Sequence, residues 1–96
     1  MVDRIKVIPS RHCNEQMIMR EITIEQIESV FNNPIDSYYD EKRQNYKTYG
    51  IVNNSLREEM PYLIVIHDKV NTSVKVITVM WADKGTLRSY EFDKIR

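Results

Sequence analysis

The sequence predicts an α+β domain in which two N-terminal helices cover one face of an antiparallel sheet of about four strands. Two helix-start signals follow each other between Ser10 and Phe31. After Pro34 the apolar residues recur at every second position, which is the period of a strand. The run at residues 62–66 is apolar throughout and predicts a central strand covered on both sides.

The length and composition indicate one globular domain over residues 1–96. The chain has 96 residues, of which 42% are hydrophobic and 29% are charged. A chain of this length can bury a modest hydrophobic core without cross-links. A single cysteine, Cys13, excludes an intrachain disulfide and suits a reducing compartment. The sequence has no apolar run of membrane-spanning length and no signal-peptide pattern. We therefore expect a cytoplasmic protein with no membrane contact.

The overall charge gives little attraction for a polyanion. Fourteen Lys and Arg residues balance fourteen Asp and Glu residues, so nucleic-acid binding would require a local cluster of cations. One such cluster falls around a predicted hairpin, whereas acidic residues gather at helical spacing elsewhere. The basic cluster is Lys42, Arg43 and Lys47, and the acidic one is Glu21, Glu25 and Glu28.

The first helix is predicted to begin after a short edge strand at residues 4–8 that Pro9 closes. Ser10 suits the N-cap, since its hydroxyl accepts a hydrogen bond from an unpaired helix N–H. Cys13 and Met17 lie four residues apart and give this helix a narrow apolar stripe.

The second helix has the clearest signals. Thr23 and Gln26 form a capping box, and Ile22 and Ile27 form the hydrophobic staple across it. The sequence Asn-Asn-Pro at 32–34 ends the helix, because the residue before a proline avoids the helical region.

The remaining elements follow from apolar alternation and from turn residues between the runs. The last fifteen residues are expected either to return along the sheet or to pack as a tail. In order, we predict a strand at 35–40, a turn at 41–44, a strand at 45–52, a loop to residue 61, a strand at 62–66, a turn at 69–73 and a strand at 74–81.

Several common site types are absent from the sequence. Gly50 and Gly85 are the only glycines, so there is no phosphate-binding or dinucleotide-binding loop. No Cys-x-x-Cys or His-x-x-x-His spacing occurs, and we expect neither a metal nor a cofactor. His67 and Asp68 could be joined to a serine as a triad on paper, but adjacency in sequence does not orient a histidine.

His12 and Arg20 on the first helix are the leading site candidates. His12 falls in the first turn, where it could act as a general base or bind a phosphate oxygen. Arg20 projects about 80° around the helix from His12, so that the two side chains could border one groove. Alternatively, His12 hydrogen-bonds a loop carbonyl and Arg20 pairs with a nearby acid.

Aromatic residues on the predicted strands are a second set of candidates. Such rings stack on bases of single-stranded RNA in many binding grooves. The alternative is ordinary cross-strand packing with a polar tip in water. The residues concerned are Tyr46, Tyr49, Tyr62 and Trp81.

Cations at the hairpin and the second histidine complete the candidate set. Lys42, Arg43 and Lys47 could clamp a phosphate, or they could form a solvated hairpin tip. His67 ends the most apolar strand. It is either a site residue or a half-buried structural histidine whose ring nitrogens are hydrogen-bonded.

Short motifs in the first 81 residues resemble an uncharacterised bacterial family of small proteins, a domain of unknown function. They are Ser-Arg-His at the first helix, Met-x-x-Arg at its end, Ile-Thr-x-x-x-Ile at the second helix and Val-Ile-Thr-Val ending at Val79. The chain has Arg20-Glu21-Ile22 where that family usually shows Arg-Gly before the Ile. The family is similar in layout to the RelE, ParE and BrnT toxins.

This resemblance implies a metal-independent ribonuclease toxin whose partners are RNA and an antitoxin protein. Only His12 and Arg20 match the nearer family's motif, whereas Lys47, Tyr49 and His67 are added from their chemistry. In this hypothesis His12 is the acid or base, Arg20 and Lys47 hold phosphate, and Tyr49 or Trp81 stacks a base. The alternative is a non-catalytic module of the same fold that docks a protein through a sheet face or an edge strand.

Overall fold

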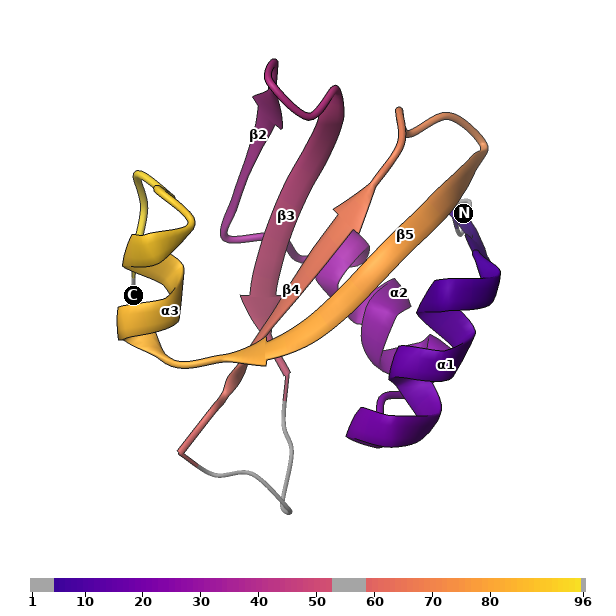
Figure 1. Ribbon diagram of the computed structural model, residues 1–96, viewed down its shortest axis with the longest axis horizontal. Coiled ribbons are helices and arrows are strands. Elements are labelled where there is room, and N and C mark those ends of the chain that lie inside the picture. The colour runs from indigo at the N-terminus through magenta and orange to yellow at the C-terminus, as the bar shows by residue number, and fades with distance from the viewer. Residues whose placement is uncertain (1–4, 53–58, 96) are drawn as a thin grey trace.

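The computed structural model describes residues 5–52 and 59–95, which form a five-stranded sheet with helices on both faces (Figure 1). The strand order across the sheet is β1-β5-β4-β3-β2. Residues 53–58 of the loop predicted to run to residue 61, and the predicted start of the first strand at residue 4, lie outside the described residues. The elements are β1 (Lys6–Pro9), α1 (Arg11–Arg20), α2 (Ile24–Asn32), β2 (Asp36–Asp40), β3 (Asn45–Ile51), β4 (Tyr62–His67), β5 (Ser73–Ala82) and α3 (Lys84–Ser89).

The sheet is mixed, so the prediction of about four antiparallel strands is wrong in number and in one direction. Strands β2, β3, β4 and β5 are antiparallel neighbours, but β1 pairs in parallel with β5, with Val7 opposite Val74. The chain leaves β1, passes through α1 and α2 over one face, and enters the sheet again at the opposite edge as β2. A four-residue strand carries too short a pattern to specify which edge it joins.

The two N-terminal helices begin where the sequence predicts. The Ser10 hydroxyl accepts from the Cys13 N–H at 3.0 Å and donates to the Ile77 carbonyl at 3.0 Å. At α2 the Thr23 hydroxyl accepts from the Gln26 N–H at 3.2 Å, and the Gln26 side chain accepts from the Thr23 N–H at 2.9 Å. Both caps are therefore confirmed.

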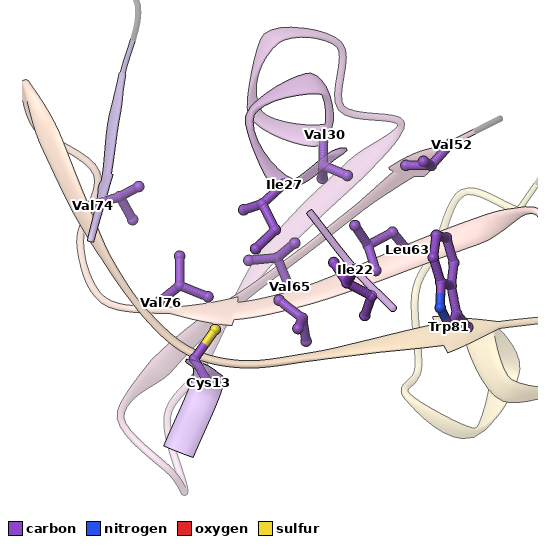
Figure 2. Packing of buried hydrophobic residues seen from close by; sticks show 11 residues of the cluster. Cys13, Ile22, Ile27, Val30, Val52, Leu63, Val65, Val74, Val76 and Trp81 are labelled. Atoms are coloured by element: carbon purple, nitrogen blue, oxygen red, sulfur yellow. The ribbon is translucent and has the colours of Figure 1, made fainter. Parts of the chain in front are cut away.

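One hydrophobic core lies between these helices and the sheet. Figure 2 shows Ile27 and Val30 of α2 above Leu63 and Val65 of β4, and Cys13 of α1 beside Val76 of β5. This arrangement confirms that α1 and α2 cover one face. The buried members of this cluster are Cys13, Ile22, Ile27, Val30, Val52, Leu63, Val65, Val74, Val76, Val79 and Trp81.

A second core lies on the other face, under α3 and the residues that follow it. Asp83 caps α3 by accepting from the Thr86 N–H at 2.8 Å, and Leu87 and Phe92 then pack on Tyr49. The C-terminal residues therefore pack as a tail, which is one of the two expected arrangements. The helix within them was not predicted, because it has only six residues and one of them, Gly85, disfavours a helix. Within the two described ranges, no helix has the length and apolar character to cross a membrane.

Candidate functional site

The structure divides the predicted site residues between the two faces of the sheet. Side chains alternate along β3. Thr48 faces α2 and bonds to His67, whereas Tyr49 belongs to the core under α3. Lys47, two residues before Tyr49, shares its face. His67 and Lys47 thus lie on opposite sides of the sheet and do not form one site.

His12 and Arg20 are also kept apart. They lie near opposite ends of α1, and eight residues of helix separate their backbones by about 12 Å. His12 is exposed in the first turn. The Arg20 guanidinium donates to the Val79 carbonyl at 2.6 Å, and the Arg20 carbonyl accepts from the Trp81 indole N–H at 2.8 Å. Arg20 and the buried Trp81 therefore fasten the end of α1 to β5.

Tyr49 is a packing residue in this structure. Its side chain is wholly buried, its hydroxyl donates to the Lys94 carbonyl, and its ring meets Tyr62 and Phe92 edge to face. A base cannot stack on this ring while the C-terminal segment covers it.

A cleft lies between the β2–β3 turn and the end of α3, on the α3 side of the sheet. Its volume is about 710 Å³, within the range of about 300–1,000 Å³ typical of ligand sites. We call it the hairpin cleft. It is lined by Tyr38, Tyr39, Asp40, Glu41, Lys42, Arg43, Lys47, Ser89, Tyr90 and Glu91.

A nearly buried ion pair is part of the lining of the hairpin cleft. The Lys47 ammonium lies 2.6 Å from an Asp40 carboxylate oxygen and 3.0 Å from the Asn45 amide oxygen. Only 1% of Lys47 is exposed. The hydrogen bond from Lys47 holds the pKa of Asp40 below its ordinary value, so Asp40 stays ionised. Lys47 is thus a fixed charge that is already neutralised by its neighbour.

Tyr38 connects the two walls of the cleft. Its hydroxyl donates to the Tyr90 carbonyl, and its ring packs edge to face against Phe92. Burial, and then the negative charge of Asp40, raise the pKa of Tyr38. The phenol therefore remains neutral at physiological pH and continues to donate this bond.

Two further cations stand at the turn and are available to a ligand. Lys42 and Arg43 are exposed, and within the described parts of the chain neither side chain has a carboxylate within 4.0 Å. The Arg43 backbone N–H donates to Asp40 at 3.2 Å, which ties the turn to the ion pair below it.

Glu91 lies on the opposite wall in a strained backbone conformation. Its φ is 62°, in the left-handed region that favours glycine. The Phe92 N–H bonds to the Leu87 carbonyl at 3.3 Å and the Glu91 N–H bonds to the Arg88 carbonyl at 2.9 Å, so Glu91 occupies the position that usually holds glycine after a helix. This turn sets a carboxylate at the edge of the cleft.

His67 lies on the α1–α2 side of the sheet, in a different environment. Its Nδ1 is 2.6 Å from the Asp68 carbonyl oxygen and its Nε2 is 2.7 Å from the Thr48 hydroxyl. Because Asp68 contributes its carbonyl rather than its carboxylate, these contacts do not make a Ser-His-Asp triad. Burial lowers the pKa of His67, which keeps the ring neutral.

In the ranges that the structure describes, no three His, Cys, Asp or Glu side chains are grouped to hold a metal ion. Burial raises the pKa of Cys13 to about 11, so its thiol stays protonated.

Comparison with known proteins places this small α+β domain in a family. Residues 10–81, three quarters of the chain, match the family described as "Domain of unknown function (DUF4258)", and the chain belongs to that family. No curated protein matches the chain, and no solved structure matches it.

The sequence predicted the three cations of the hairpin cleft but missed its other components. Tyr38 and Tyr39 precede the basic turn on β2, and their position beside it was the available signal. Tyr90 and Glu91 reach the cleft only because α3 folds back over the sheet, and no local pattern marks that return.

Proposed function

We propose that this protein is a metal-independent endoribonuclease, toxin-like in its role, that binds single-stranded RNA in the hairpin cleft. The proposal rests on one observation, the meeting of cations, tyrosine rings and carboxylates in a cleft of about 710 Å³. It moves the chemistry away from His12 and Arg20, which the structure keeps apart.

The lining of the cleft matches the parts of an RNA strand. Lys42 and Arg43 hold phosphate, and arginine can do so with two parallel hydrogen bonds. Tyr90 lines the opposite wall and is only partly buried, so it offers a ring for a base to stack on. Three carboxylates offset the three cations, so affinity comes from local contacts and varies only weakly with salt.

The same groups can support a cleavage in which the RNA supplies the nucleophile, its own 2′-hydroxyl. The 2′-hydroxyl attacks the adjacent phosphorus while its proton passes to the Glu91 carboxylate. The bond from phosphorus to the 5′ oxygen breaks, that oxygen takes a proton from solvent, and Glu91 returns its proton to solvent. The products are a 2′,3′-cyclic phosphate and a 5′-hydroxyl. Lys42 and Arg43 stabilise the extra negative charge on the phosphate in the transition state.

The test is cleavage of a fluorescent single-stranded RNA in the presence of EDTA. Replacing Lys42 and Arg43 together by Ala removes two phosphate contacts from an exposed turn, and we expect cleavage to fall about 100-fold. His12→Ala and Arg20→Met serve as controls and should cleave within about twofold of wild type. Wild type that neither binds nor cleaves the RNA, or a double variant that cleaves normally, would contradict the proposal.

A matched pair of glycine variants separates the chemistry of Glu91 from its structural role. Glu91 and Glu21 both follow a helix with a left-handed backbone, at φ of 62° and 56°. Glycine relieves this strain, so the free energy of unfolding of both variants should exceed that of wild type by about 0.5–1 kcal/mol. Only Glu91→Gly should lose cleavage, by about 100-fold. Equal activity in the two variants would exclude Glu91 as the base.

A second candidate function, docking of a protein partner, is favoured by the outer face of α1. Ile18 and Met19 are adjacent apolar side chains on this helix, and they are 80% and 74% exposed. The ion pair between Arg11 and Glu15, at 3.9 Å, lies on the same helix. These features suit a partner helix with an apolar stripe and a polar border, such as an antitoxin protein.

Docking is tested by replacing Ile18 and Met19 with Gln and recovering proteins from the source cells. A partner bound by wild type should bind the double variant about 100-fold more weakly once purified. Ile51→Gln is the matched control, because Ile51 is also exposed, at 57%, but lies at the end of β3. Equal binding by all three proteins would exclude this surface.

A further inference from the structure

A second cavity lies on the α1–α2 side of the sheet, opposite the hairpin cleft. Its volume is about 390 Å³. We call it the His67 cavity. Its apolar walls are Ile5, Phe31, Pro34, Tyr46 and Val70, and its polar lining is Ser37, Thr48, His67 and Lys69.

The hydrogen bonds of His67 determine where its proton lies. Nδ1 is 2.6 Å from the Asp68 carbonyl oxygen, and a carbonyl can only accept, so Nδ1 carries the hydrogen. Only 1% of His67 is exposed, and burial lowers the pKa of the ring and keeps it neutral. Nε2 is therefore an acceptor and takes the hydroxyl hydrogen of Thr48 at 2.7 Å.

The direction of the bond from Thr48 to His67 also determines the direction of the bond between Ser37 and Thr48. The Thr48 oxygen lies 2.8 Å from the Ser37 oxygen. Since the Thr48 hydrogen is directed at His67, Ser37 must donate in this second bond. The only hydrogen on the Ser37 hydroxyl then points toward Thr48, and its lone pairs remain for a ligand. Thr48 is buried but Ser37 is exposed, so a ligand reaches this chain of hydroxyls through Ser37.

The rings in the cavity favour an aromatic occupant. Phe31 meets the His67 ring edge to face at 4.8 Å, and Tyr46 stacks on it at 5.8 Å with 13° between the planes. A further ring can join this group by an edge or a face contact.

We propose that the His67 cavity binds a small aromatic molecule with one O–H or N–H donor, of the phenol class. The ring packs against Phe31 and Tyr46, and the donor bonds to the Ser37 oxygen. An aromatic carboxylate cannot use the Ser37 oxygen, because its own oxygens would face the lone pairs of Ser37, and Lys69, the cation in the lining, is exposed to water. This site lies on the other face of the sheet and does not depend on the proposed ribonuclease activity.

The experiment compares phenol with toluene, which has the same ring but no donor. Each is titrated into labelled protein, and dissociation constants are taken from the NMR shifts of the Phe31 and Val70 amides. A purely apolar cavity would prefer toluene, the less water-soluble probe. We expect phenol to bind about fivefold more tightly instead, the effect of one hydrogen bond.

Two serine variants locate the acceptor. Ser37→Ala should reverse the preference to toluene. Ser89→Ala, which removes a hydroxyl that donates to the Gly85 carbonyl on the other face of the sheet, should leave the preference unchanged. Ser37 is exposed on an edge strand, so its variant should stay folded, which the dispersion of the same spectra verifies. A preference for phenol that survives in Ser37→Ala, tighter binding of benzoate than of phenol, or no shift at Phe31 and Val70 would overturn the proposal.

Discussion

Replacing Phe92 with Ala is expected to destabilise the protein by about 3–5 kcal/mol, a large part of the stability of a small domain. Phe92 is 5% exposed and lies beyond the last helix, where it packs edge to face on Tyr38 at 5.2 Å and on Tyr49 at 4.7 Å. Its loss leaves a cavity between the C-terminal segment and the sheet. Urea unfolding followed by circular dichroism measures the effect.

Phe92→Leu is the matched control and should recover most of the stability, because it keeps an apolar side chain of similar volume. Hydrogen bonds hold the segment as well, among them those from the Tyr38 and Tyr49 hydroxyls to the Tyr90 and Lys94 carbonyls. The Asp93 and Lys94 N–H groups donate to Asp36 at 3.0 and 3.1 Å, in an exposed position. If Phe92→Ala lost less than about 1 kcal/mol, the C-terminal segment would not share the cooperative core of the sheet.

The Phe92 substitution also bears on the hairpin cleft. Ser89, Tyr90 and Glu91 form one wall of the cleft, and they are held in place by the packing of Leu87 and Phe92. A protein in which this segment detaches should lose RNA binding even at temperatures where the rest of the sheet stays folded. The cleft is thus a product of the C-terminal packing, not of the hairpin alone.

Local signals in the sequence predicted the helices and most strands well. The caps at Ser10 and Thr23 are formed by neighbouring residues, so they can be read without knowing the rest of the fold. The pairing of β1 with β5 joins segments more than sixty residues apart, and nothing local specifies it. The short helix α3 lacks a periodic pattern for a similar reason, since six residues span fewer than two turns.

The candidate site was predicted less well, because side-chain partners are set by packing. The spacing of Lys47 and Tyr49 places them on one face of β3, but it does not reveal that Asp40 neutralises the first and that the C-terminal segment covers the second. Arg20 has the chemistry of a phosphate ligand, yet its guanidinium bonds to the Val79 carbonyl. The roles of Lys47 and Tyr49 in a ribonuclease stay predictions, and Arg20→Met tests that of Arg20.

The stability of the protein is expected to fall as the pH drops below about 6.5, because of His67. Its pKa is lowered in the folded state, chiefly by burial, while the carbonyl and the charge of Asp68 act in the opposite direction. Above the unfolded pKa of about 6.5 both states are neutral, and the group has no effect on stability. Between that value and the lower folded pKa, the unfolded chain binds the proton and the folded protein does not. Stability therefore falls by up to about 1.4 kcal/mol per pH unit in this window.

Urea unfolding at intervals between pH 7.5 and 5 measures this slope. His67→Gln should remove it, since a glutamine does not titrate, although the variant will be less stable at every pH. His12→Ala is the matched control: it removes the other histidine, which is exposed, and should keep the wild-type slope. Stability that stays flat across this range in wild type would mean that His67 accepts a proton without leaving its place between Thr48 and Asp68. In that case the hydroxyl of Ser37 would turn outward as a donor at low pH, and the preference of the His67 cavity for phenol would be lost there.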